Sequence, residues 1–204
     1  MEKPLEEIVK QLAEDIGNIE YISSSDIPGV DLYMDQVTTF MEEQLSSTKR
    51  HEDDKILTKT MINNYAKNNL LPSPVKKKYT KDHLILLTYI YYYKNLLSIN
   101  DIQKLLSPMI EKFFYTDNSN ATLTDLYDKI FSMCDGKREY FKESIARNFK
   151  IAQDSFADES DEINQEKEYL QLFAFICLLG QDVYGKLLLI NKLIDLMPEA
   201  TKKK

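Results

Sequence analysis

Apolar residues recur every three or four positions along most of the 204-residue chain, which is the spacing of amphipathic helices. Short stretches rich in Ser, Asp, Pro and Gly, such as residues 23–29, interrupt the pattern and are typical of loops. The pattern predicts helices over Pro4–Ile16, Leu32–Leu45, Thr58–Asn68, Lys81–Leu96, Ser98–Ser107, Leu123–Cys134, Arg138–Phe156 and Gln165–Met197, with Pro108 ending the fifth and a break near Gly180 or Gly185 in the last.

A short extended segment is predicted after the third helix. Pro72 and Pro74 cannot continue that helix, because proline lacks an N–H donor and restricts the residue before it. Residues 75–79 are then short and basic, which fits a small strand or wing. Thr80 is expected to cap the next helix, which is apolar nearly all round and is therefore expected to be central. The predicted fold class is all-α with at most a minimal β wing.

The composition is that of a soluble globular protein, with 43% hydrophobic and 29% charged residues. The longest apolar run, Leu172–Leu179, is about half of the roughly 20 residues that a membrane span needs, so we expect a buried helix there and no membrane partner. The first ten residues lack the apolar core of an export signal. Cys134 and Cys177 stand in apolar contexts and are expected to be buried thiols of a cytoplasmic protein.

The charge of the chain is distributed unevenly. From Lys55 to Lys81 there are seven lysines and no acidic residue, so this segment carries +7. The whole chain carries −7, which leaves −14 on the other 177 residues. This asymmetry indicates a localised anionic partner, with the acidic remainder limiting nonspecific adhesion.

The helix within this basic segment has two faces of different chemistry. With Thr58 as N-cap and about 100° per residue, Met61, Ile62, Tyr65 and Ala66 form one apolar face. The other face holds Lys, Thr and Asn without a carboxylate. Most such helices are merely solvated, but an ordinary solvated face mixes Glu with Lys. Asn can pair bidentately with adenine in the major groove, and Lys neutralises phosphates. The sequence therefore predicts that Thr58, Lys59, Thr60, Asn63, Asn64 and Lys67 face the major groove, with Lys76, Lys77 and Lys78 as a wing on the DNA backbone.

The same segment resembles MerR-type regulators. Their recognition helix and turn follow the pattern hydrophobic, Arg, Tyr, Tyr, Glu, two variable residues, Gly, Leu, Leu, Pro. In residues 61–72, Tyr65 matches the second tyrosine and Leu70-Leu71-Pro72 matches outright. Asn69 replaces the glycine, and Asn tolerates the left-handed conformation at a helix end. Asn63 and Asn64 replace the arginine and the first tyrosine.

The resemblance extends through the following wing and helices. Lys77-Lys78-Tyr79-Thr80 resembles the Arg-x-Tyr-Ser that ends the family's wing, and residues 97–102 resemble its Phe-Ser-Leu-Glu-Glu-Ile. It covers Leu57 to Leu106, with a shorter wing and with residues 46–54 in place of a tight turn. The whole chain also looks like an uncharacterised bacterial domain family of unknown function.

The resemblance implies a winged helix-turn-helix domain followed by a helical bundle. We expect an N-terminal helix and loop over 1–26, a MerR-like domain over 27–108, and a helical region for dimerisation or effector binding over 109–204. The expected function is a transcriptional regulator on double-stranded DNA. A homodimer is expected because one short recognition helix reads too few base pairs alone, and Tyr169–Met197 is the most apolar candidate interface. A small-molecule or protein effector is a further candidate partner. The alternative is a non-enzymatic helical module that meets an acidic protein through the same lysines.

No catalytic, metal or cofactor motif stands out. The chain lacks a phosphate-binding glycine loop, a Ser-centred elbow and metal-spaced Cys and His residues, so we expect no enzyme, no metal and no cofactor. His51 and His83 are expected at the surface or in capping roles. Tyr89 and Tyr91–Tyr93 are expected to pack between helices, and Asp154–Glu162 to form a solvated loop.

Overall fold

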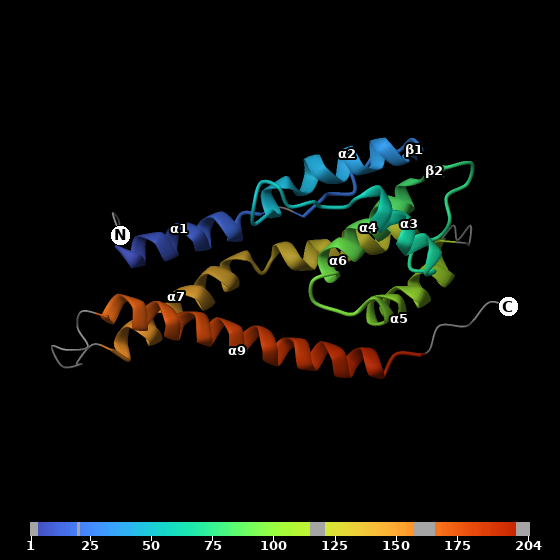
Figure 1. The fold of residues 1–204 in the computed structure, drawn as a ribbon. Helices are drawn as coiled ribbons and strands as arrows, with labels where there is room; N and C mark the ends of the chain where they lie inside the picture. Colours follow the sequence, from blue (N-terminus) through green and yellow to red (C-terminus); the bar gives the residue numbers. More distant parts are fainter. Residues whose placement is uncertain (1–3, 20, 115–120, 157–165, 199–204) are drawn as a thin grey trace. The chain divides into compact units, whose positions relative to one another are not determined.

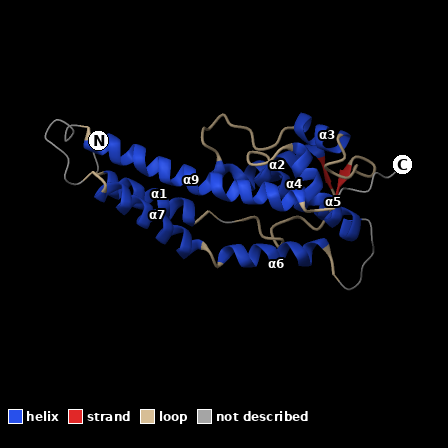
Figure 2. Cartoon of the chain, turned by 90° about the horizontal axis from the view of Figure 1, so that it is seen from below, coloured by secondary structure: helices blue, strands red, loops and turns tan. Residues whose placement is uncertain are grey.

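The computed structural model describes residues 4–19, 21–114, 121–156 and 166–198. These parts are mostly helical, with one two-stranded antiparallel sheet, so the predicted all-α fold with a minimal β element is confirmed (Figures 1 and 2). In chain order the elements are α1 (Leu5–Gly17), β1 (Leu32–Tyr33), α2 (Met34–Leu45), the 3-10 turn η1 (Ser46–Thr48), α3 (Lys59–Lys67), β2 (Lys78–Tyr79), α4 (Lys81–Tyr93), α5 (Ile99–Met109), the π-helical turn η2 (Ile110–Phe114), α6 (Leu123–Asp135), α7 (Arg138–Asp154) and α9 (Lys167–Asp195).

The chain divides into two compact units by its internal contacts. We call residues 21–132 and 190–204 the wing unit, and residues 1–20 and 133–189 the α1–α7 unit. This division by contacts does not test the domain boundaries expected from the sequence, at 26/27 and 108/109, which stay a prediction.

The wing unit has α4 at its centre. Every residue from His83 to Ile90 is buried, as expected for a helix that is apolar nearly all round. α5 and β2 pack against α4, while α2 packs against α3 and β2. The sheet pairs Leu32 with Tyr79 and Tyr33 with Lys78. Fixing β2 to both α4 and β1 holds the basic segment on a rigid base.

The tyrosines of α4 pack between helices, as the sequence predicts. Tyr89 is buried and its ring lies 5.6 Å from that of Tyr127, centroid to centroid. The Tyr127 hydroxyl donates a 2.5 Å hydrogen bond to the carbonyl oxygen of Ile22. Burial raises the pKa of Tyr92 to about 12, so its ring is a neutral packing group.

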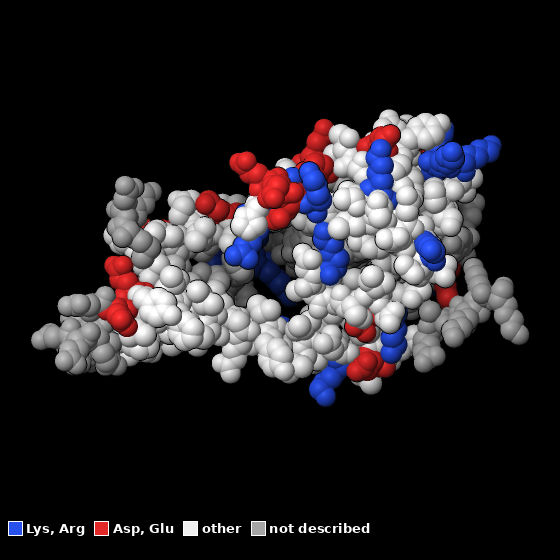
Figure 3. All heavy atoms as spheres, in the orientation of Figure 1, with Lys and Arg blue, Asp and Glu red and all other residues white. Residues whose placement is uncertain are grey.

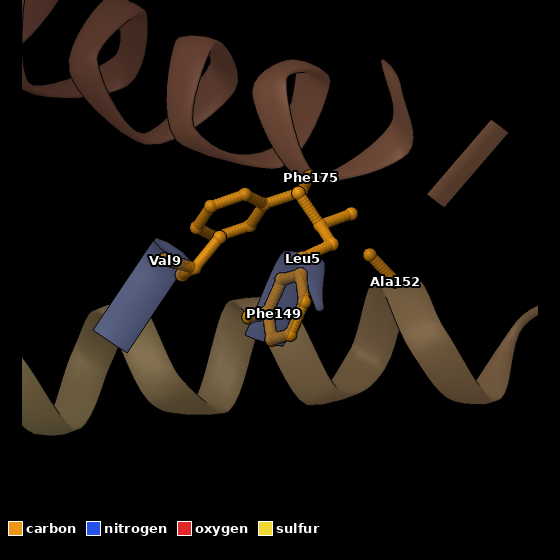
Figure 4. Close-up of a cluster of buried hydrophobic side chains, with 5 residues drawn as sticks. All are labelled: Leu5, Val9, Phe149, Ala152 and Phe175. Atoms are coloured by element: carbon orange, nitrogen blue, oxygen red, sulfur yellow. The ribbon is translucent and has the colours of Figure 1, made fainter. Parts of the chain in front are cut away.

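The α1–α7 unit has a small core where three helices meet. Leu5 and Val9 of α1, Phe149 and Ala152 of α7 and Phe175 of α9 form it (Figure 4). The rings of Phe149 and Phe175 meet edge to face, with centroids 5.2 Å apart. Only one side of the part of α9 in this unit contributes to the core.

Several helix boundaries differ from the predicted ones. Residues 32–33 form β1 rather than the start of a helix, because pairing with β2 is invisible to local periodicity. α4 ends at Tyr93, three residues early. α5 continues past Pro108, since Leu106 and Ile110 are both buried and their packing offsets the roughly 3 kcal/mol that proline costs inside a helix.

α9 differs most from its prediction. It runs unbroken through Gly180 and Gly185, because a glycine costs a helix only about 1 kcal/mol. By length and composition its 29 residues could cross a membrane. Only 6% of its most apolar stretch is buried, so the prediction of a buried helix at Leu172–Leu179 is wrong. Cys177 on α9 is exposed and Cys134 is half-buried, so the expectation of two buried thiols is also wrong. The expected acidic loop lies, for residues 157–162, outside the described residues.

Candidate nucleic-acid interface

α3 presents the polar face that its sequence predicts. The Thr58 hydroxyl accepts a 3.2 Å hydrogen bond from the backbone N–H of Met61 and so starts the helix. Ile62 is 0% exposed and Tyr65 is 8% exposed, which fixes the rotation of the helix about its axis. On the opposite side the structure brings five predicted site residues together at the surface: Lys59, Thr60, Asn63, Asn64 and Lys67.

The C-terminal end of α3 is fixed by a left-handed residue. Asn69 has φ 56°, as expected for an asparagine that replaces glycine at this position. Its N–H donates to the carbonyl of Ala66 at 3.2 Å, and the N–H of Leu70 donates to that of Tyr65 at 2.9 Å. Leu70 and the following Leu71 are buried. The chain therefore leaves α3 along a defined path toward the wing.

The wing is a tight turn whose two central residues are lysines. Lys76 has φ 51° and Lys77 has φ 64°, and the N–H of Lys78 donates to the carbonyl of Val75 at 3.0 Å. This is the geometry of a type I′ hairpin turn, in which Asn and Gly are the usual central residues. A left-handed conformation costs other residues roughly 1–2 kcal/mol each. The turn thus exposes two adjacent ammonium groups at a cost in stability.

Two lysines of the predicted set have partners within the chain. Lys59 forms an ion pair with Asp35 at the start of α2. Their side chains are 60% and 76% exposed, so the pair contributes at most about 1 kcal/mol and can be exchanged for another anion. The Lys78 ammonium lies 5.6 Å from the centre of the Tyr33 ring. Tyr33 is a residue that sequence reasoning missed, because only the β1–β2 pairing brings it to the wing.

One group of basic side chains lies at the end of the wing unit that carries β2 and α3. Lys and Arg side chains cluster over the loop that leads into β2, and others lie over α3 (Figure 3). Lys76 and Lys77 are exposed, whereas Lys78 and Thr58 are half-buried. The arrangement offers hydrogen-bond donors and positive charge on α3, with a second group of ammonium ions beside it.

His83 supports the wing from inside. Its Nδ1 accepts a 3.0 Å hydrogen bond from the backbone N–H of Thr80, which confirms the expected capping role, but the residue is only 2% exposed and is not at the surface. Its ring meets the rings of Tyr79 and Phe114 edge-on, at centroid distances of 5.4 and 4.8 Å. Burial lowers the pKa of His83 to about 4, so it is neutral near pH 7.

No group of three or more His, Cys, Asp or Glu side chains suited to a metal ion occurs within the described ranges.

Comparison with known proteins identifies a family but no characterised relative. A family model described as a domain of unknown function, DUF1836, matches residues 22–130, which run from before β1 into α6. The match covers this part rather than the whole chain. No curated protein and no solved structure matches the sequence.

Proposed function

The chain belongs to the DUF1836 family, and we propose that it is a DNA-binding transcriptional regulator of MerR-like winged-helix type, acting in the cytoplasm as a homodimer. α3 is the recognition helix in this proposal, with Asn63 and Asn64 reading base edges and Lys67 beside them. Lys76 and Lys77 bind phosphates of the DNA backbone. No catalytic step is proposed.

The observation that carries the proposal is the lysine turn of the wing. Lys76 and Lys77 both hold a left-handed backbone that Asn-Gly would adopt with less strain, and their like charges repel each other. The turn is therefore less stable with two lysines than it would be with Asn-Gly. Strain of this kind is typical of binding sites, and two exposed ammonium groups suit an anionic partner.

The exposed face of α3 supports a partner with both phosphates and hydrogen-bonding edges. Asn63, Asn64 and Lys67 are all exposed, and no acidic residue occurs between Lys55 and Lys81. An acidic protein would provide charge, but it would need no row of amide side chains. Duplex DNA uses both kinds of group.

The homodimer is proposed through the outer face of α9. A stripe of exposed residues spaced by three or four positions follows this face: Tyr169, Phe173, Cys177, Gly180, Tyr184 and Leu188. Together with the neighbouring Ile176 and Val183, these side chains expose on the order of 700 Å², close to the roughly 800 Å² per partner in a specific interface.

The spacing of the stripe favours a second copy of the chain. Its intervals of 4, 4, 3, 4 and 4 residues are the same in both directions, counted along Tyr169 to Leu188. An antiparallel copy therefore sets Phe173 against Tyr184 and Cys177 against Gly180, as a two-fold interface requires. Apart from the backbone of α9 and the two neighbours of Gly180, no atom of the described residues lies within 4 Å of the place where a Gly180 side chain would begin, so the helices can approach closely there.

A lipid bilayer is a poorer partner for this face. Lys186 and Asp182 form a 2.6 Å ion pair in the middle of α9, and a membrane span would carry that pair into hydrocarbon. On the same helix, Phe175 packs against α1 and α7, whose other faces carry many charges.

DNA binding is tested by retention of the full chain on a pool of duplexes at rising salt. We expect retention to fall steeply with salt, because lysines replace counterions on the backbone. Asn63→Ala should change which sequences are selected. Lys77→Ala should weaken all sequences about equally and flatten the salt slope by about one unit. Lys129→Ala, an exposed lysine on α6, is the matched control and should change neither.

A module that binds an acidic protein instead of DNA predicts no selective retention on duplexes. If no duplex is enriched, or if neither substitution nor salt changes retention, the DNA proposal fails and an acidic protein partner becomes the better hypothesis.

The dimer is tested by crosslinking through Cys177. Each Cys177 would lie one and a half residues from the midpoint of the stripe, so the thiols of two copies would be within roughly 10 Å. A short thiol-specific crosslinker should join wild-type chains and Cys134→Ser chains, but not Cys177→Ser chains. Crosslinking that depends on Cys134 instead would contradict the α9 interface.

A further inference from the structure

A polar pocket of about 320 Å³ lies in the wing unit, apart from the residues assigned above. Residues from the segment 48–56 form one wall, and residues from 91–95, at and just beyond the C-terminal end of α4, form the other. Four of the lining residues are basic, Lys49, Arg50, Lys55 and Lys94, and one, Asp54, is acidic. The lining therefore carries a net charge of +3 in a chain whose total is −7.

Contacts within the chain position the wall at the end of α4. The Lys94 ammonium donates a 2.7 Å hydrogen bond to the carbonyl oxygen of Ile56 and lies 4.8 Å from the centre of the Tyr91 ring. The Tyr91 hydroxyl is in turn hydrogen bonded to Thr48. Burial lowers the pKa of Lys94, although nearby Asp54 opposes the shift. An ammonium ion is thus held in a partly desolvated place, where an added anion is attracted strongly.

The acidic groups near the pocket already have partners. Glu42 forms an ion pair with Lys49, and this hydrogen bond holds the pKa of Glu42 below its ordinary value. One carboxylate oxygen of Asp54 accepts a 3.0 Å hydrogen bond from the backbone N–H of His51. Arg50 and Lys55 form no ion pair with any residue that the structure describes. Arg50 and Lys55 are therefore free of direct ion pairs among the described residues, although the Glu42 carboxylate attracts Lys55 at longer range.

The charge of this pocket is not a general property of the surface. A groove of about 600 Å³ in the α1–α7 unit is lined by five acidic and three basic residues, a net charge of −2. Concave surfaces concentrate the field of their charged groups, so the two sites attract ligands of opposite sign.

We propose that the basic pocket binds the phosphate group of a small phosphorylated molecule. The planar fork of Arg50 matches the spacing of phosphate oxygens, and Lys55 and Lys94 supply point charges around it. A volume of about 320 Å³ suits a compact ligand. The pocket borders the C-terminal end of α4, whereas the wing precedes its N-terminal end, roughly 20 Å along the helix. The proposal does not depend on DNA binding.

The test titrates the full chain with inorganic phosphate against chloride at the same ionic strength, by calorimetry and by the thermal unfolding midpoint. Phosphate should release or absorb heat saturably and raise the midpoint. Arg50→Gln and Lys55→Gln should each weaken phosphate binding about tenfold. In chloride each should leave the midpoint unchanged or raise it, because it removes like-charge repulsion. Lys129→Gln, outside the pocket, should behave as the wild type does.

Other outcomes overturn the proposal. A response to phosphate that equals the response to chloride, or that survives both pocket substitutions, shows that no such site exists. A lower midpoint of both variants in chloride indicates that these cations serve stability instead. Duplex DNA that displaces phosphate from the pocket reassigns it to the DNA backbone. A failed duplex titration with intact phosphate binding defeats only the DNA function.

Discussion

The wing unit and the α1–α7 unit use their apolar residues in different ways. In the wing unit, α4 buries eight consecutive residues, His83–Ile90, among the helices of the same chain. In the α1–α7 unit, α9 buries Phe175 but leaves Phe173 and Tyr184 56% and 62% exposed. The first arrangement completes its own core. The second leaves an exposed apolar face, and large faces of this kind mark interaction sites.

The largest effect is expected from opening the closed core. Leu86→Ala in α4 should lower the unfolding free energy of the wing unit by about 3 kcal/mol, because Leu86 is 0% exposed and its loss leaves a cavity. Leu189→Ala in α9, where the side chain is 58% exposed, should change stability by less than about 0.5 kcal/mol. Amide hydrogen exchange of α4 and α9 measures both. Equal effects would remove the contrast between the two units.

Acid should weaken the wing unit through His83. Its pKa of about 4 lies below the ordinary 6.5, so between these values the unfolded chain binds a proton that the folded chain does not. Stability should therefore fall by up to roughly 3 kcal/mol as the pH drops from about 6.5 to about 4. In His83→Gln this contribution should vanish, since Gln can cap α4 without titrating. Urea unfolding at several pH values measures it, with His51→Gln as the control. An unchanged profile for His83→Gln would contradict the assignment.

Self-association should depend on the exposed stripe of α9 from Tyr169 to Leu188 and not on apolar residues elsewhere on that helix. Phe173→Ser should weaken the dimer 10- to 100-fold, or about 1.4–2.7 kcal/mol, because the residue lies within the proposed contact. Leu189→Ser removes a similarly exposed apolar side chain from another face of the same helix and should have little effect. Sedimentation over a range of concentrations distinguishes them. If both variants dissociate equally, the face is wrongly chosen.

The smallest expected effect is a gain in stability at the wing. The double substitution Lys76→Asn and Lys77→Gly should stabilise the chain by about 1–2 kcal/mol, because these residues favour the type I′ turn. It should also weaken DNA retention. Replacing both lysines with Gln keeps the strain and removes the charge, so it should weaken retention without the gain. Denaturant unfolding and duplex retention are the two measurements. A loss of stability in the Asn-Gly variant would show that the turn is not strained.

Local chemistry was enough to predict the parts of the candidate site that depend on neighbouring residues. The capping oxygen of Thr58, the apolar face of α3 and the left-handed Asn69 all follow from preferences within one or two turns of chain. Tyr33 beside Lys78 and Asp35 beside Lys59 were not predicted, because residues more than twenty positions apart meet only through packing and strand pairing. The basic pocket was not predicted for the same reason, since its two walls come from residues 48–56 and 91–95.

The sequence by itself determined the helical fold class, the central place of α4 and the two faces of α3, because periodicity and capping act over short distances. The tertiary structure decided whether an apolar helix is buried. α4 and α9 are both strongly apolar, but only α4 is surrounded by other helices, and no local signal distinguished them. It also decided the partners of the basic residues. Which lysines remain available to a ligand depends on the carboxylates, rings and carbonyls that the fold brings near them, and those come from distant parts of the chain.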